Sequence, residues 1–264
     1  SGFCVFFIYL YLFAHDSHEA EYHTRSGWRP DRDIFRRLVR FGFPSGIQFF
    51  VDIASFTAFI LVLGRLGMME LASSNIAFNI NSLAFMPIIG LGTGVTILTG
   101  QYLGRNIPDT AEKTVHAGFR MAFVYMGFIG SLYVFTPALF LAPFKPESDT
   151  VSFVAIRNLA KILLRFVALY SFFDAMSIIF SSALRGAGDT KFVMKISMSL
   201  SIICLLVPTS LSVFFLGAGI ISCWLILTFY AVFLGLFFYL RFRNGSWKSM
   251  RVIEHNPDNA DMNN

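Results

Sequence analysis

The chain alternates long apolar runs with short polar connections, and its charged residues are confined to a few short stretches. A run of about 20 mostly apolar residues is the length that an α-helix needs to cross a bilayer. The apolar stretch at 1–14 ends before a polar segment. Beyond that segment the pattern predicts six membrane-spanning helices, near 41–63, 71–103, 111–136, 150–184, 190–215 and 218–240.

The composition excludes an ordinary soluble domain. Of the 264 residues, 55% are hydrophobic and 14% are charged. A soluble domain of this length could not bury so much apolar surface and still present a polar exterior. The fold class is therefore all-α and multi-pass, with the lipid bilayer as one partner.

Lysine and arginine predict the orientation of these helices. Sixteen of the 21 basic residues fall in alternate connections on one side of the membrane, which the positive-inside rule assigns to the cytoplasm. We expect a cytoplasmic linker at 15–40, a six-helix lobe at 41–243 and a cytoplasmic tail at 244–264. The net charge of +5 follows from this bias and indicates no nucleic-acid partner.

The start of the chain carries neither a methionine nor a basic segment ahead of its first apolar run. That run is typical of the end of a membrane helix and not of a signal peptide. We expect 1–14 to end a preceding transmembrane helix of a longer protein.

The second predicted span is too long for a straight crossing. It contains Pro87, which cannot donate a helical hydrogen bond, and Gly90 soon after it. These residues predict a kink or a break, and hence a hinge, in that helix.

Two acidic residues, Asp52 and Asp174, fall near the middle of predicted spans. An ionisable group at that depth costs a few kcal/mol on the most lenient scales, so it normally faces an interior cavity. Arg157, Lys161 and Arg165 lie on the opposite side of the helix from Asp174, at about 100° per residue. We expect these three to reach the membrane interface and not to pair with Asp174.

Polar side chains form stripes beside both carboxylates. Gln48 and Ser55 flank Asp52 at helical spacing, and Tyr170 precedes Asp174 by one turn. A third stripe on the second helix consists of Asn75, Asn79 and Ser82. Asparagines in a membrane helix often only bond a neighbouring helix, and that interpretation stays open for Asn75 and Asn79. Together, the three stripes predict one hydrated cavity.

Two carboxylates on neighbouring helices have a simple chemistry. At short range they share a proton or hold a cation between them. Protonation and cation binding then exclude each other, and both can be coupled to a third, cationic ligand. The pair Asp52 and Asp174 therefore predicts an antiporter with no catalytic residue.

Four segments in this order carry a resemblance to a known family: "GFPSGIQFFVDIASF" (42–56), "NIAFNINSLAFMPIIGLG" (75–92), "QYLGRN" (101–106) and "SALRGAGDTKF" (182–192). Together they resemble the C-terminal half of the multidrug and toxic compound extrusion (MATE) family, in its NorM-like branch. The resemblance implies one six-helix lobe of a twelve-helix transporter that opens alternately to the two sides of a bacterial inner membrane. The missing partner would be the N-terminal lobe.

The family resemblance also implies roles for individual residues. Asp52, Asp174 and Tyr170 would form the site for a coupling ion, Na⁺ or H⁺, with no other cofactor. Asp52 is one methylene shorter than the Glu common there. Organic cations and drugs would be the exported substrates, and the residues that line their cavity would be Gln48, Ser55, Asn75, Asn79 and Ser82.

Two other functions are compatible with parts of the pattern. A lipid-linked oligosaccharide flippase of the same superfamily shares the fold, although such proteins line their cavity with basic residues. An intramembrane aspartyl protease needs two membrane aspartates, and "GAGD" at 186–189 matches its GxGD motif. Asp189, however, lies between basic residues at a helix end.

Overall fold

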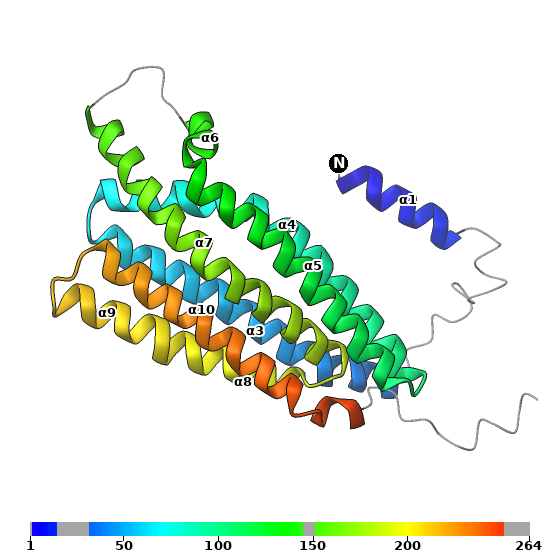
Figure 1. The fold of residues 1–264 in the computed structure, drawn as a ribbon. Coiled ribbons are helices and arrows are strands. Elements are labelled where there is room, and N and C mark those ends of the chain that lie inside the picture. Colours follow the sequence, from blue (N-terminus) through cyan, green and yellow to red (C-terminus); the bar gives the residue numbers. More distant parts are fainter. Residues whose placement is uncertain (1, 15–31, 145–150, 251–264) are drawn as a thin grey trace, which may run out of the picture. The chain divides into compact units, whose positions relative to one another are not determined.

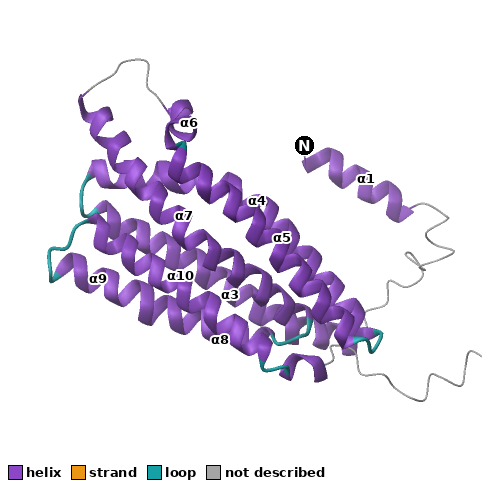
Figure 2. Ribbon diagram, viewed as in Figure 1, coloured by secondary structure: helices purple, strands orange, loops and turns teal. Residues whose placement is uncertain are grey.

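The computed structural model describes residues 2–14, 32–144 and 151–250. Every regular element in these ranges is helical (Figure 2). The chain divides into two compact units, 1–40 and 41–264. The first unit contains α1 (Gly2–Ala14) and the first turns of α3. The second unit contains the rest of the described chain.

Six helical spans within the described ranges are long and apolar enough to cross a membrane, as the sequence predicts. They are α3 (Arg32–Gly64), α4 (Met68–Gly104), α5 (Pro108–Phe135), α7 (Val151–Gly186), the run α8 (Thr190–Leu200), η2 (Ser201–Leu206) and α9 (Val207–Phe214), and α10 (Ile220–Arg243). Their outer faces carry many exposed large apolar side chains, for example Phe49, Leu61 and Phe128. Such a surface suits lipid and not water.

The connections within the second unit gather at its two ends (Figure 1). The α3–α4 and α9–α10 connections lie at the same end as the short helix α6 (Pro137–Leu141). The α4–α5 and α7–α8 connections lie at the other end, near the 3₁₀ turn η3 (Ser246–Ser249). Successive spans therefore run in opposite directions, as alternating crossings require.

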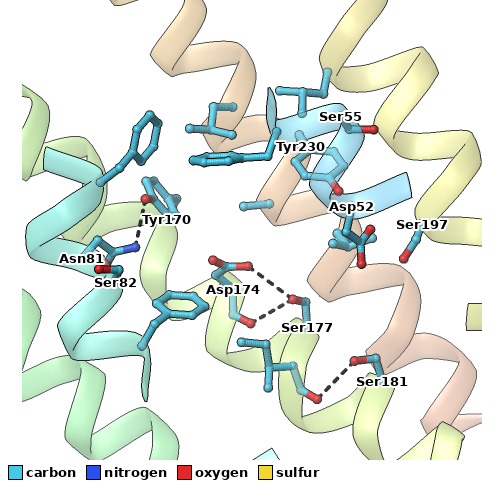
Figure 3. A pocket seen from close by; sticks show the side chains of 18 of the residues that line it. Asp52, Ser55, Asn81, Ser82, Tyr170, Asp174, Ser177, Ser181, Ser197 and Tyr230 are labelled. Carbon is cyan, nitrogen blue, oxygen red and sulfur yellow. Dashed lines mark hydrogen bonds between the residues drawn. The ribbon is translucent and has the colours of Figure 1, made fainter. Parts of the chain in front are cut away.

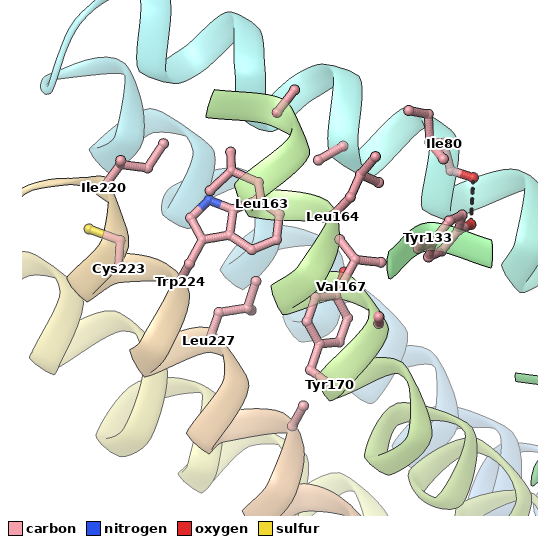
Figure 4. Close-up of a cluster of buried hydrophobic side chains, with 14 of the residues drawn as sticks. Ile80, Tyr133, Leu163, Leu164, Val167, Tyr170, Ile220, Cys223, Trp224 and Leu227 are labelled. Atoms are coloured by element: carbon pink, nitrogen blue, oxygen red, sulfur yellow. Dashed lines mark hydrogen bonds between the residues drawn. The ribbon is translucent and has the colours of Figure 1, made fainter. Parts of the chain in front are cut away.

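Helix α7 is the centre of the second unit. It packs against α4, α5 and α10, and its span is the most buried of the six. Around one end of α7, Trp224 of α10 is fully buried among leucine and valine side chains (Figure 4). Its indole Nε1 donates to Ser74 Oγ of α4 at 3.2 Å, and its ring stacks on Phe78 with centroids 4.9 Å apart. Trp224 thus joins α4, α7 and α10.

Small residues bring α4 and α7 into close contact near the end of the unit that holds the α7–α8 connection. A Cβ added at Gly186 would collide with the backbone oxygen of Thr96, and one at Gly100 would lie 3.3 Å from the backbone oxygen of Gly186. The Thr96 hydroxyl lies 3.0 Å from the carbonyl oxygen of Ser182. This seam follows the small-residue packing that membrane helices favour. It fixes one end of the α4–α7 pair.

The fifth span contains six residues of π-helix, η2, between α8 and α9. Pro208, in the first turn of α9, has no N–H to donate, and a π-helical insertion accommodates such a defect. Ser201 begins η2, and its hydroxyl bonds the hydroxyl of Tyr230 on α10 at 3.1 Å. The insertion therefore lies against α10.

The structure differs from the sequence prediction in three places. Helix α3 begins at Arg32, inside the expected linker, whose residues 15–31 lie outside the described residues. Helix α4 is continuous through Pro87, so of the kink or break that the sequence predicts, the break does not occur. Within the expected polar tail, Trp247 is buried and stacks on Phe242 with centroids 4.8 Å apart. The density of charged residues therefore predicts the start of α3 too late in the chain. It also gives no sign that Trp247 is buried.

Candidate functional site

A cavity of about 580 Å³ lies among α3, α4, α7, α10 and the α8–η2 run. Its volume is in the range of small-molecule binding sites. All eight cavity and cation-site positions expected from the sequence line it: Gln48, Asp52, Ser55, Asn75, Asn79, Ser82, Tyr170 and Asp174. The expected hinge residues, Pro87 and Gly90, are exposed and are not among its lining residues.

Asp52 projects from α3 into this cavity, beside Tyr230 and Ser197 (Figure 3). Its Oδ2 accepts a hydrogen bond from Gln48 Nε2, one turn earlier, at 3.3 Å. Its Oδ1 is buried and has no hydrogen-bond partner among the described residues. A buried, unsatisfied carboxylate oxygen is costly unless a ligand or a proton satisfies it.

Asp174 projects from α7 toward the same space (Figure 3). Ser177 Oγ donates to the Asp174 backbone oxygen at 2.8 Å and lies 3.5 Å from Asp174 Oδ1. The carboxylate is therefore only weakly held by its own helix. Asp174 and Asp52 thus line the same cavity, from α7 and α3.

Tyr170 lies one turn before Asp174 and is buried. Its hydroxyl accepts a hydrogen bond from Asn81 Nδ2 of α4 at 3.1 Å (Figure 3). Asn81 is buried too, and its Oδ1 has no partner within the described part of the chain. Asn81 does not fall on the stripe of Asn75, Asn79 and Ser82, so the sequence pattern does not single it out.

The polar stripe that the sequence predicts on α4 is exposed, and its residues Asn75, Asn79 and Ser82 line the cavity. Asn79 Nδ2 donates to the backbone oxygen of Asn75 at 2.9 Å, and Ser82 Oγ donates to the backbone oxygen of Asn79 at 2.8 Å. Among the described residues, these side chains bond only the backbone of their own helix. The geometry thus favours cavity lining over a bond between helices for Asn79 and Ser82.

Arg185 is the main cavity residue that the sequence analysis did not find. The charge count assigned it to a cytoplasmic connection, but α7 continues to Gly186 and the side chain lines the cavity. A helical wheel could have placed it there, since Arg185 follows Asp174 by eleven residues and so returns to nearly the same face. Ser177 and Ser181 lie between them on that face and also line the cavity.

The cationic residues near the start of α7 lie elsewhere, as the sequence predicts. Arg157 and Arg165 are exposed, and neither lines the central cavity. Asp189, of the GxGD-like motif, is also outside the lining. Its Oδ2 accepts a 2.8 Å hydrogen bond from Arg241 Nε, so this carboxylate is part of an ion pair between the start of α8 and the end of α10.

The cavity offers donors that could hold a hard monovalent cation. No group of three His, Cys, Asp or Glu side chains is placed for a metal in the described ranges. The available donors are carboxylate, amide and hydroxyl oxygens, which suit ions such as Na⁺. The unsatisfied oxygens of Asp52 and Asn81 fit such a ligand.

A sequence model of the MatE family matches residues 44–209, which include both cavity carboxylates. The chain belongs to the MatE family. This confirms the resemblance to the NorM-like MATE transporters. The family assignment, the six apolar helices and the exposed apolar surface together identify a multi-pass membrane protein of this family.

Relatives of this MatE chain carry names from multidrug resistance. It is 31% identical over 216 residues to a probable multidrug resistance protein NorM of Pseudomonas putida, covering 81% of this chain and 46% of that protein. It is 31% identical to the multidrug resistance protein PmpM of Pseudomonas aeruginosa, covering 66% and 35%. The chain therefore spans less than half the length of these relatives.

Solved MATE structures share the fold of this chain. An outward-facing multidrug resistance MATE family transporter of the MOP superfamily matches with a TM-score of 0.75 and 17% identity. The match covers 86% of this chain and 50% of that one. A six-helix lobe that corresponds to half of a MATE transporter is the fold that the sequence predicts.

Proposed function

We propose that the chain supplies the C-terminal lobe of a cation-coupled antiporter, which exports organic cations by alternating access. The N-terminal lobe of the same transporter would be its partner. The linker and the C-terminus would lie in the cytoplasm of a bacterial cell, with the lobe in the inner membrane. The names of the multidrug resistance relatives support a role in drug export.

The observation that carries this proposal is the position of Asp52 and Asp174 in one cavity between membrane helices. An ionisable side chain at membrane depth is expected to serve a substrate or ion pathway. Phe56, Phe78 and Phe85 add aromatic walls to the same cavity. Aromatic faces attract organic cations, so the lining combines negative charge with the apolar surface that such substrates need.

The coupling follows from competition for the two carboxylates. When Na⁺ or H⁺ neutralises the pair, an organic cation loses its electrostatic attraction to the cavity. When the ion leaves, the buried carboxylates again favour the organic cation. Mutually exclusive binding of this kind is sufficient for exchange, provided that the cavity opens to one side at a time.

The flippase alternative has one observation in its favour, since Arg185 adds a positive charge to the lining. Two carboxylates still outnumber this cation, and a lipid-linked pyrophosphate would have to approach them. The excess of negative charge therefore favours a cationic substrate.

Equilibrium binding of tetraphenylphosphonium to the purified full-length protein tests the proposal. This ion has a fixed charge, so a change of pH alters only the protein. We expect Asp52→Asn and Asp174→Asn each to weaken binding at least about tenfold, and Na⁺ or protons to compete with the ligand in the wild type. Asp109→Asn, an exposed carboxylate outside the cavity, is the matched control. Binding that neither cavity substitution changes would refute the proposal.

A further inference from the structure

Arg185 is linked to Asp52 through one amide. Its Nη1 donates to Gln48 Oε1 at 3.4 Å, and Gln48 Nε2 donates to Asp52 Oδ2 at 3.3 Å. A guanidinium only donates and a carboxylate only accepts, so an amide between them must present its oxygen to Arg185 and its nitrogen to Asp52. Gln48 is buried, which fixes it in this bridge.

Both hydrogen bonds of this bridge, at 3.3 and 3.4 Å, are longer than the usual range of about 2.7–3.2 Å and are therefore weak. The second anchor of the guanidinium is a hydrogen bond from Nη2 to Ser182 Oγ at 3.1 Å. Even so, only one amide separates the guanidinium from the Asp52 carboxylate. The positive charge is thus close enough to compensate Asp52, but it is held weakly enough to be replaced.

Arg185 also lines a second cavity. This cavity, of about 540 Å³, lies beyond the guanidinium, toward the α7–α8 connection, and its lining includes Phe41, Gln101 and Gly188. Of the described residues that line the central cavity, Arg185 alone also lines this second one. The second cavity is therefore space that the side chain could enter when another cation occupies the central cavity.

We propose that Arg185 is a built-in competitor, a tethered cation that compensates Asp52 through Gln48 and that a cationic substrate must displace. This inference rests on the proposed function, because it needs Asp52 to attract the substrate. In this view Arg185, which lies on the same helix as Asp174, lowers the affinity of the cavity for a cationic substrate. Weak binding of cargo permits release, which a transporter needs as much as capture.

Tetraphenylphosphonium binding at alkaline pH, where protons compete least, measures this competition. Arg185→Gln removes the charge but keeps groups that can bond Ser182 and Gln48. We expect it to bind the ligand about tenfold more tightly, the size of effect that one neighbouring charge has on an ionised group. Arg185→Lys restores the charge and should bind more weakly than Arg185→Gln.

Arg165→Gln is the matched control, because it removes the same charge from an exposed position of the same helix. It distinguishes a local effect at the cavity from a change in the net charge of the protein. Tighter binding by Arg185→Gln alone supports the inference. Unchanged or weaker binding by the folded Arg185→Gln protein overturns it.

Gln48→Met gives a second test that does not remove the charge, should Arg185→Gln fail to fold. Tetraphenylphosphonium cannot form hydrogen bonds, so the Gln48 amide should change its binding only through the effect on Asp52. We expect about threefold tighter binding, the effect of one weak hydrogen bond. Unchanged or weaker binding contradicts the bridge.

The double variant Asp52→Asn with Arg185→Gln separates this inference from the proposed function. If Asp52→Asn alone leaves binding intact, the proposed function fails, and the competitor role fails with it. If Asp52→Asn weakens binding but Arg185→Gln still tightens it in that background, only the competitor role fails. The inference predicts that the effect of Arg185→Gln disappears without Asp52.

Discussion

Asn81 of α4 donates a hydrogen bond to the hydroxyl of Tyr170 on α7, and both side chains are buried. The pair crosses the α4–α7 interface at the wall of the central cavity. Farther along the same two helices, Thr96 and Gly186 are in direct contact. The cavity thus opens between helices that a polar pair joins on one side and a small-residue seam joins on the other.

Tyr170→Phe should destabilise the protein by about 1–3 kcal/mol in its free energy of unfolding, because it leaves Asn81 Nδ2 buried without its acceptor. Thermal unfolding of the purified protein in detergent measures this loss. The double variant Tyr170→Phe with Asn81→Leu removes both partners and should recover part of the stability. A double variant that is less stable than both single variants would contradict a simple pairwise bond.

Gly186→Ala should reduce the free energy of unfolding by about 1–3 kcal/mol or more, because its Cβ meets the backbone of Thr96 and backbone atoms cannot move aside cheaply. Gly90→Ala is the matched control on α4, since a Cβ there meets nothing within 4 Å. Thermal unfolding should place Gly90→Ala within about 1 kcal/mol of wild type. Equal losses for both variants would disprove the seam.

Gly90→Ala also tests the hinge that the sequence predicts near Pro87. If this part of α4 must bend during transport, the variant should keep its stability but export its substrate more slowly. Unchanged transport by this stable variant would exclude a hinge at Gly90.

Asp189 and Arg241 should be energetically coupled. Their ion pair joins α8 to α10, and the side chain of Asp189 is only 9% exposed. Arg241 also lies over the ring of Phe192 at 4.7 Å. A double-mutant cycle of Asp189→Asn and Arg241→Gln, read by thermal unfolding, should give a coupling energy of about 1–3 kcal/mol. Additive effects would show that the pair contributes no direct interaction.

In the segment after α10, Trp247 should contribute more to the stability of the protein than Lys248. Trp247 is buried and donates to the backbone oxygen of Phe242 at 2.8 Å, so Trp247→Ala should cost about 3–5 kcal/mol in the free energy of unfolding. Lys248 pairs with Glu112 of α5 near the surface, and Lys248→Ala should cost less than about 1 kcal/mol. Thermal unfolding compares the two variants. Equal losses would contradict this order.

The contribution of the Lys248–Glu112 ion pair to stability should depend on pH in a definite direction. The hydrogen bond to Glu112 raises the pKa of Lys248 above its ordinary value. The stabilisation is therefore fully present below the unfolded pKa of lysine and is lost as the pH rises through the folded pKa. We expect Lys248→Ala to leave the pH dependence of stability unchanged between neutral pH and the ordinary lysine pKa, as unfolding at several pH values would reveal.

The sequence predicts most of the fold because membrane spans follow from local composition. Asp52 and Asp174 stand out for the same reason, since each interrupts an apolar helix. Arg185 did not stand out, because a cation near a helix end fits the topogenic charge pattern as well as it fits a cavity. Only the length of α7 and the direction of the side chain separate these two roles.

Other features depend on tertiary contacts that a single helix does not encode. Asn81 is one of several polar residues on α4, and only the position of Tyr170 distinguishes it. The π-helical segment η2 changes the hydrogen-bond register of a span whose composition is unremarkably apolar. Trp247 lies in a polar segment, and it is buried with its ring stacked on Phe242.

Exchange across a membrane tests the central claim most directly. Efflux of ethidium from proteoliposomes that contain the full-length protein would be measured under an imposed Na⁺ gradient and then under a proton gradient. Asp52→Asn, Asp174→Asn and the control Asp109→Asn would be measured beside the wild type. We predict that one gradient drives efflux by the wild type and the control, and that both cavity variants lose it. Gradient-driven efflux that survives both cavity substitutions would contradict a paired-carboxylate antiporter.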